Sequence, residues 1–564
     1  MRFNLFFSYI LLFILFSIAE AKPSPKLTSH EMDFTILKKI PTQHGGRLKP
    51  LDTFAREALQ TVTGKTKFHN MEAIEVIFSW MFYPTTWNET PAIEITLDAV
   101  KNKLGLNIKQ KYFSLEEIYR SGGLQKLLQE VHEKQEREEK LSRIEEGFSR
   151  VSVQITVLER VSSGELLHII PHKEGEQGNW FSLAQLSEPH QFHEVYRDEK
   201  SRNLLEHIHT QFASLARAYD NNEKDVFFTL TKDIEAQLSQ LSSKPNYPFV
   251  TSLKREVFYN SFHPFRKAWI FYVFSFISFL LYFALSKNKI LATLGFSTSL
   301  LAFAFHVFGF YLRCVITGHP PVGNMYESVV WVSLGIVFFA FILLYQYKNF
   351  IVLAVASVVS SIGLILADNL PLVLDPTINP LTPVLRSNFW LTIHVLTITL
   401  SYAAFALAMG LGNLALFKIL THPEKKEAIK NLTEFIYRCI QIGVLLLAAG
   451  TILGGVWADY SWGRFWGWDP KEVWALIALL LYLAVVHGKF AGWLKDFGLA
   501  VCSVIAFQGV LMAWYGVNFV LGVGLHAYGF GSGGLSYVLS YVLIQIFFIL
   551  ASWYRLKTRV LHAK

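Results

Sequence analysis

The sequence predicts a membrane α-helical protein: a polytopic bundle of about nine transmembrane helices after an N-terminal signal sequence and an extracytoplasmic α+β, mainly helical domain. Of the 564 residues, 52% are hydrophobic and 17% are charged, which is too apolar a composition for a soluble chain of this length. The apolar residues are also unevenly placed. Long apolar runs follow one another after residue 265, whereas residues 22–265 contain none of membrane length.

Residues 1–21 resemble a secretory signal peptide. Arg2 precedes an apolar stretch, and the small residues AEA end at Ala21, which is typical of a cleavage site. An uncleaved N-terminal anchor is the alternative interpretation, and the sequence leaves both open.

Residues 22–265 predict a soluble domain in which helices dominate. Residues 115–147 are rich in helix formers and contain a break at Gly122–Gly123. Residues 199–243 predict two helices joined at an Asp-Asn-Asn turn. Between these regions, the β-branched residues of 151–161 (VSVQITVLERV) predict a strand.

Residues 266–564 predict the polytopic part, because each apolar run is near the twenty residues that cross a bilayer. The expected spans are 269–286, 290–311, 326–346, 350–367, 389–418, 435–456, 473–488, 497–520 and 534–554. Lys and Arg gather in every second connection and in the tail, which marks those connections as cytoplasmic. The formal net charge of +8 is therefore mainly topological, and nothing in the sequence indicates nucleic-acid binding.

The three cysteines, Cys314, Cys439 and Cys502, form no CxxC pair. Two of them fall within expected spans, so neither a disulfide framework nor a Cys-rich metal site is supported. His44, in the segment IPTQHGGRLKPLDTFAREAL, is expected in a loop beside a Gly turn.

Two histidines of the membrane part are expected at one depth on the outward side. His394 begins the fifth span, and His526 lies in the loop after the eighth. The segment WGRFWGWDPKEVW (462–474) joins spans six and seven on the same side. Two imidazoles beside an aromatic, glycine-cut surface suit a flat metallomacrocycle such as heme, because His nitrogens ligate heme iron and aromatic faces stack on porphyrin.

The segment 462–474 contributes four tryptophans and several charges to this expected site. The tryptophans are Trp462, Trp466, Trp468 and Trp474, and the cations that could meet the heme propionates are Arg464, Lys471 and Arg386. Each piece also has a plainer interpretation. The tryptophans could form an interfacial belt, His394 could be a helix-start residue and His526 a surface residue.

Three further residues have competing interpretations. His487 falls roughly 20 Å into its span, at 1.5 Å per residue, so it is either a second heme ligand or a helix-end histidine that reaches the headgroups. His306 is expected in the outward half of the second span, away from His487. Asp469 precedes Pro470 and suits an N-cap, which explains the DP pair without heme, and Glu472 suits the helix dipole.

The segment WGRFWGWDPKEVW closely resembles the tryptophan-rich WWD signature of heme-handling membrane proteins. Its DPKEVW end resembles the cytochrome c synthase of the system II pathway (CcsA type) rather than the system I relatives. The similarity extends through most of residues 265–560 and includes GHPPVGNMYESVVW (318–331), SNFWLTIHV (387–395) and YGVNFVLGVGLHAYGFG (515–531).

The resemblance implies a cytochrome c synthase that binds heme b, presents it at the outer face of the bacterial inner membrane and promotes thioether attachment to the CxxCH motif of apocytochrome c. It implies His394 and His526 as outward axial ligands, His487 as an intramembrane ligand, and Asp469 with the connector tryptophans in the heme-binding signature. In fused synthases a ResB/CcsB-type membrane part supplies a second intramembrane histidine. The soluble domain stands there in this chain, which implies a separate partner subunit.

The expected partners are therefore apocytochrome c, a ResB/CcsB-like subunit, a thiol-reducing protein and the lipid bilayer. Two alternatives use the same sequence features. A heme exporter or chaperone would deliver heme without forming the bond, and an unrelated polytopic transporter would carry only an aromatic belt.

Overall fold

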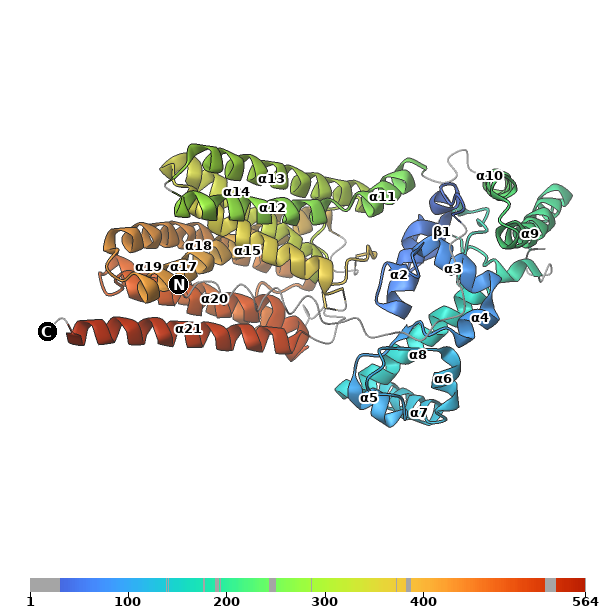
Figure 1. The fold of residues 1–564 in the computed structure, drawn as a ribbon, viewed down its shortest axis with the longest axis horizontal. Helices are drawn as coiled ribbons and strands as arrows, with labels where there is room; N and C mark the ends of the chain where they lie inside the picture. The colour runs from blue at the N-terminus through green and yellow to red at the C-terminus, as the bar shows by residue number, and fades with distance from the viewer. Residues whose placement is uncertain are drawn as a thin grey trace. The chain divides into compact units, whose positions relative to one another are not determined.

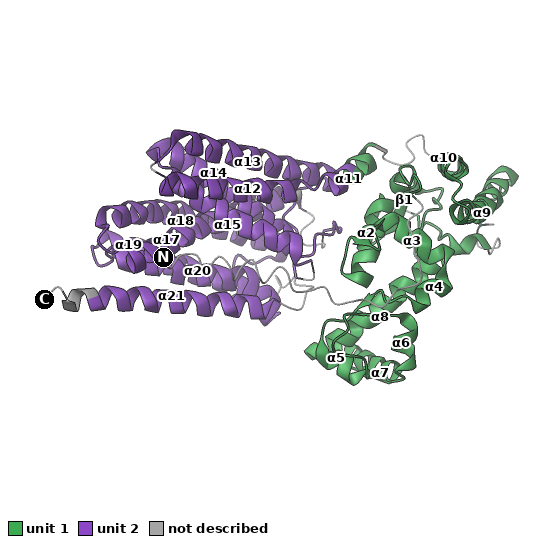
Figure 2. Cartoon of the chain, viewed as in Figure 1, with its two compact units in different colours: residues 1–257 green, residues 258–564 purple. Residues whose placement is uncertain are grey.

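The computed structural model divides the chain into two compact units, residues 1–257 and residues 258–564 (Figure 2). The structure describes residues 31–137, 139, 141–175, 178–187, 192, 194–242, 250–285, 287–371, 373–381, 387–522 and 534–562. The signal sequence expected at residues 1–21 lies outside these residues.

Unit 1 is mainly helical (Figure 1). Its described residues form three two-stranded antiparallel sheets. Its strands are β1 (Pro41–His44), β2 (Arg47–Pro50), β3 (Lys67–Phe68), β4 (Met71–Glu72), β5 (Ile93–Glu94) and β6 (Tyr112–Phe113). Its helices are α2 (Leu51–Thr63), α3 (Ala73–Phe82), α4 (Pro84–Glu89), α5 (Asp98–Lys103), α6 (Leu115–Arg120), α7 (Leu124–Glu136), α8 (Arg143–Ser162), α9 (Glu199–Asp220) and α10 (Lys224–Leu241), with short 3₁₀ turns at Leu37–Lys39 and Ala184–Ser187. Helix α11 (Val250–Phe262) contains the point where the two units divide.

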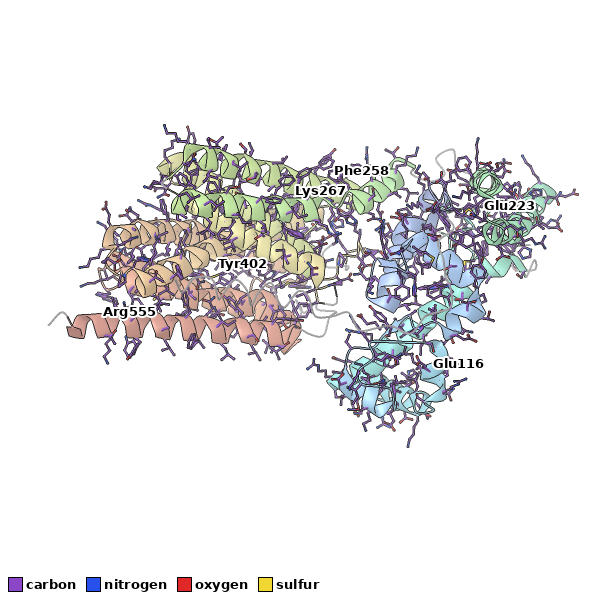
Figure 3. The ribbon with its side chains drawn as sticks, in the orientation of Figure 1. Glu116, Glu223, Phe258, Lys267, Tyr402 and Arg555 are labelled. Atoms are coloured by element: carbon purple, nitrogen blue, oxygen red, sulfur yellow. The ribbon has the colours of Figure 1, made fainter. Side chains whose placement is uncertain are left out.

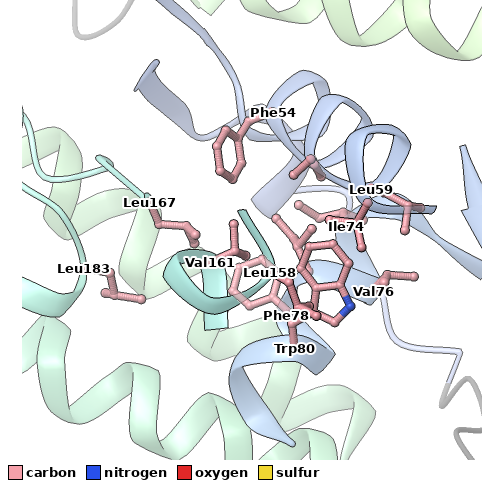
Figure 4. Close-up of a cluster of buried hydrophobic side chains, with 14 of the residues drawn as sticks. Phe54, Leu59, Ile74, Val76, Phe78, Trp80, Leu158, Val161, Leu167 and Leu183 are labelled. Atoms are coloured by element: carbon pink, nitrogen blue, oxygen red, sulfur yellow. The ribbon is translucent and has the colours of Figure 1, made fainter. Parts of the chain in front are cut away.

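The strand predicted at residues 151–161 is wrong, because these residues lie within α8. A capping box of Ser142 and Glu145 starts this helix. Val151, Ile155 and Leu158 are buried at helical spacing and join the core of unit 1, which also contains Phe54, Phe78 and Trp80 (Figure 4). Packing on one helix face therefore overrides the β-branched composition.

Two other expectations for unit 1 are confirmed. A break at Gly122, whose φ is +69°, separates α6 from α7, and a turn after Asp220 separates α9 from α10. His44 is the last residue of β1, paired with Arg47, and is followed by the Gly45–Gly46 turn in which both glycines have positive φ. The expected glycine turn is present, but His44 belongs to the strand and not to the loop.

Unit 2 is a bundle of long apolar helices (Figure 1). They are α12 (Pro264–Ala284), α13 (Lys289–Thr317), α14 (Met325–Tyr347), α15 (Phe350–Asn369), α17 (Leu396–Thr421), α18 (Lys426–Trp462), α19 (Pro470–Phe490), α20 (Asp496–Leu511) and α21 (Leu535–His562). The short helix α16 (Asn388–Trp390) and the π-helical segment η6 (Leu391–Val395) precede α17, and the π-helical segment η7 (Met512–Leu521) follows α20. Among the described residues, nine helices are long and apolar enough to cross a membrane, as predicted. The chain is a multi-pass membrane protein.

Successive long helices of unit 2 alternate in direction, so their ends fall into two groups. One end carries residues 463–469, the connector between α18 and α19, and we call it the connector end. Asn324 there donates to the carbonyl of Thr377, and a Cβ at Gly534 would contact Tyr515, so chain-distant helix ends meet. The basic tail with Arg555 lies at the other end of the bundle, away from Lys267 at the start of α12 (Figure 3).

Helices α17 and α18 approach closely because α18 presents glycines to α17. A Cβ at Gly450 would lie 2.8 Å from the Cα of Ile398, and one at Gly454 would lie 2.6 Å from Cε1 of His394. A Cβ at Gly443 would meet the ring of Phe405. Small residues at such a contact let two membrane helices pack backbone to side chain.

Candidate functional site

The connector, residues 463–469, is bounded by the C-terminal cap of α18 and the N-terminal cap of α19. Helix α18 ends at Trp462, and Gly463 follows with φ of +69°. Asp469 caps α19: its Oδ1 accepts from the Lys471 amide at 3.1 Å, while Glu472 Oε2 accepts from the amides of Asp469 at 3.2 Å and Gly467 at 2.8 Å. The predicted N-cap role of Asp469 is confirmed.

The connector tryptophans differ in exposure. Trp468 has 71% of its surface exposed and holds φ of +57°, a backbone conformation that is strained for an aromatic residue. Trp466 is half-buried and lies perpendicular to Trp468, with ring centroids 6.1 Å apart. The Arg464 guanidinium lies 5.9 Å from the ring of Trp462 and over Gly467, where any side chain would collide with it.

His394 lies in the π-helical segment η6 at the start of the fifth span. Its Nδ1 is 2.8 Å from the carbonyl oxygen of Gly450 on α18. A carbonyl only accepts, so Nδ1 carries the proton and the lone pair belongs to Nε2. Trp457 packs edge-on at 5.6 Å between ring centroids. These two contacts hold the ring in one tautomer and orientation, and metal-bound histidines in general donate a hydrogen bond from their other ring nitrogen in this way.

A small hydrophobic cluster brings three chain-distant segments together around this histidine. Val322, Leu391 and Trp457 are its buried members, from the loop before α14, from η6 and from α18. Trp331 and Trp390 pack against it. Two of the segments, 318–331 and 387–395, were singled out in the sequence, and the third leads into the connector.

The other two membrane histidines differ sharply. His487 lies in the last turn of α19, as its expected depth requires, and is exposed; its Nδ1 donates to the carbonyl of Leu483 at 2.7 Å. His306 is fully buried on α13, and both its nitrogens have partners: Nε2 donates to the carbonyl of Val330 at 3.0 Å, and Nδ1 lies 3.4 Å from the hydroxyl of Tyr272. His306 is a structural residue in this arrangement.

Of the remaining predicted site residues, two lie outside the described residues and two lie at the start of α19. His526 and Arg386 lie outside the described residues. Lys471 and Trp474 are half-buried in the first turns of α19, next to the connector. The connector, His394 and the start of α19 therefore all lie at the connector end, while His487 lies at the opposite end.

Sequence reasoning missed a buried ion pair at the connector end. Arg313 at the end of α13 and Glu327 at the start of α14 are 2.7 Å apart at their closest atoms. Both are ionisable residues next to apolar runs, a signal that marks candidate functional groups in membrane proteins.

The residues present fit heme in two respects that the structure shows. His394 offers an imidazole of defined tautomer, and its ring packs directly on Gly454, where a Cβ would lie 2.6 Å from Cε1. Phe465 and Trp468 expose large aromatic surfaces at the connector. When bound, heme would supply an iron that takes axial imidazole ligands and vinyl groups that accept thiols.

The fold and these residues define a class of protein: a polytopic helical membrane protein with a histidine and an aromatic connector at one end of the bundle. The family described as "Cytochrome C assembly protein" matches residues 322–526. The cytochrome c biogenesis protein CcsA of Guillardia theta is 32% identical over 282 residues, covering 45% of this chain and 92% of that protein. The chain belongs to this cytochrome c assembly family.

Two other relatives extend the comparison. CcsA of Prochlorococcus marinus is 35% identical over 257 residues, covering 39% of this chain and 79% of that protein. Protein NrfI of Wolinella succinogenes is 30% identical over 508 residues, covering 86% of this chain and 53% of that protein. The chain thus spans about half the length of NrfI, and the match extends into unit 1. The predicted resemblance to CcsA-type proteins is confirmed.

Proposed function

We propose that this chain is a cytochrome c synthase subunit that holds heme b at the outward face of the bacterial inner membrane while apocytochrome c acquires thioether bonds through its CxxCH motif. The observation that carries the proposal is His394, with its Nδ1 bonded to Gly450 beside the aromatic connector. Membership of the cytochrome c assembly family supports a role in cytochrome c maturation. The histidine and the aromatic connector support heme as the molecule that is bound.

The work of the chain in this proposal is positioning. His394 Nε2 would ligate the iron on one face, and His526 would ligate it on the other. Arg464 and Lys471 would meet the propionates, since cations bind carboxylates through charge-assisted hydrogen bonds. Heme and a peptide cysteine held in register would convert a bimolecular encounter into an effectively intramolecular one. The chain need supply no nucleophile, because both thiols come from the apocytochrome.

His487 supports a second element of the proposal, a partner subunit. Its ring is exposed near the basic end of α19, and its Nδ1 donates to its own helix, which leaves the lone pair on Nε2. A ResB/CcsB-like membrane subunit would supply the facing histidine, and a thiol-reducing protein would keep the cysteines reduced. Unit 1 would stand on the periplasmic side, as the basic connections at the other end of the bundle indicate.

The test is reconstitution of the purified full chain, with any co-purifying subunit, with heme and an apocytochrome carrying CxxCH. A synthase makes the heme resistant to acid–organic extraction, and His394→Ala abolishes that product and alters the spectrum of bound heme. Retention of heme without covalent product would instead favour the alternative, a heme exporter or chaperone. Unchanged attachment and spectrum in both His394→Ala and His526→Ala would refute the ligand assignment.

A further inference from the structure

The buried ion pair at the connector end has no part in the reaction proposed above. Arg313 Nε and Nη2 donate to Glu327 Oε1 at 3.0 and 2.7 Å, and the two side chains are 1% and 5% exposed. A buried ion pair offsets its desolvation only when its remaining donors and acceptors also find partners. Here Arg313 Nη1 donates to the carbonyl of Pro376 at 3.0 Å and to the hydroxyl of Tyr259 at 3.3 Å.

The same pair fixes the loop that enters α14. Glu327 Oε2 accepts from the amide of Gly323 at 2.9 Å, and the Glu327 amide donates to the side chain of Asn324 at 2.9 Å, which caps the helix. One carboxylate therefore holds both the loop before α14 and the guanidinium of α13. Both bonds lie within the segment of residues 322–331.

Residues 322–331 in turn contact the segment that carries His394. Val322 shares a buried hydrophobic cluster with Leu391, which precedes the histidine in sequence, and with Trp457. The indole of Trp331 donates to the carbonyl of Leu396, which follows the histidine, at 3.3 Å. His394 thus lies between two residues that this segment holds, while Gly450 fixes its ring from α18.

The segment also reaches the helix that leads to His526. The indole of Trp514, in η7, donates to the hydroxyl of Ser328 at 2.8 Å. The start of α14 is therefore hydrogen-bonded to η7 and to Leu396, the first residue of α17, which directly follows η6. Short π-helical stretches are frequent at functional sites, and they need neighbours that hold them.

We propose that Arg313 and Glu327 are positioning residues for the outward site: the pair holds residues 322–331 in place, and this segment holds η6, and with it the His394 ring, in the orientation that ligates heme. The inference rests on the proposed function. It assigns no contact between the pair and heme.

The chain offers a matched control in a second Arg–carboxylate fork of unit 2. Arg266 donates to Asp368 from Nε at 2.8 Å and from Nη2 at 2.9 Å, at the helix ends α12 and α15 on the connector end. The side chains of Arg266 and Asp368 are more exposed than those of the first pair, at 46% and 22%. Within the described residues, neither forms a hydrogen bond to η6 or to the segment 322–331. Glu327→Gln and Asp368→Asn thus make the same carboxylate-to-amide change in two forks.

The experiment has two readouts on the purified full-length chain. In heme-free protein, amide hydrogen exchange of residues 387–398 is expected to accelerate in Glu327→Gln and to stay at the wild-type rate in Asp368→Asn. In protein purified with heme, Glu327→Gln is expected to retain on the order of 10-fold less heme, as for other residues that orient a ligand, with shifted g-values of the low-spin ferric iron. These g-values depend on the orientation of the axial imidazole planes.

Arg313→Lys keeps the charge but loses the two-pronged contact, and it decides the case if Glu327→Gln does not fold. Faster exchange of residues 387–398 in Arg313→Lys, with α19 and α20 exchanging as in the wild type, supports positioning. Wild-type exchange there overturns it, as does equal acceleration in Asp368→Asn. Wild-type protein that binds no heme would overturn the proposed function, whereas the exchange measurement on heme-free protein still decides the role of the pair.

Discussion

Gly454 is the position at which one added methyl group tests the proposed ligand most directly. In Gly454→Ala the new Cβ would lie 2.6 Å from Cε1 of His394 and 3.2 Å from Nε2. Carbon atoms pack at about 3.5–4.0 Å, so the ring must move by roughly 1 Å. That shift would carry Nδ1 out of hydrogen-bond range of the Gly450 carbonyl, now 2.8 Å away.

The expected cost has two parts. Losing the hydrogen bond removes about 0.5–1.5 kcal/mol of stability. Displacing an oriented ligand is expected to weaken heme binding by about 10- to 100-fold. The assay is the heme content per chain of protein purified from membranes, with the absorption spectrum of the heme that remains.

Gly443→Ala is the matched control for this variant. It lies on the same helix, α18, and its Cβ would meet the ring of Phe405 on the same neighbour, α17. It therefore disturbs the same helix pair away from the histidine. Wild-type heme content and spectrum in Gly454→Ala would refute the reasoning, and so would an equal loss in Gly443→Ala.

Four further outcomes are expected. Asp469→Asn keeps an acceptor and is expected to retain activity, whereas Asp469→Ala is expected to lose about 1 kcal/mol of cap stability and to expose residues 463–469 to faster hydrogen exchange. His306→Leu is expected to lower the thermal stability of the chain with no change in the heme spectrum. His487→Ala is expected to remove one population of bound heme and to leave the outward population intact, as two separable spectra would report. Burial, with repulsion from Lys49, lowers the pKa of His44 from 6.5 to about 4, so folding favours the neutral ring. As the pH falls from 6.5 towards 4, residues 41–50 are therefore expected to lose hydrogen-exchange protection, after correction for intrinsic exchange rates. The His44→Gln variant is expected to flatten this pH dependence.

Much of unit 2 could be predicted from the sequence, because a membrane span is encoded locally. Each of the nine apolar runs corresponds to one candidate span. The cap at Asp469 was also local, since an Asp-Pro pair followed by Glu472 specifies a helix start within four residues. His487 was placed at the right depth by helix rise alone.

Features that depend on contacts between distant segments could not be predicted. Residues 151–161 have the β-branched content of a strand, and packing against the core of unit 1 makes them helical. The bond from His394 to Gly450 joins residues 56 positions apart, and the π-helical geometry of η6 accompanies it. The Arg313–Glu327 pair likewise joins two helices, so the spacing of the two residues along the chain does not predict that they form an ion pair.

The left-handed backbone of Trp468 has a consequence for how tightly a flat guest can be held. Folding bears the strain of that conformation, about 1–3 kcal/mol, because the capped start of α19 imposes it. The backbone that carries the indole is therefore already ordered before a ligand binds, so little conformational entropy of this segment is lost on binding. In the proposed heme site this connector would hold heme by preorganisation, so loosening its cap would weaken heme binding even with every aromatic side chain still in place.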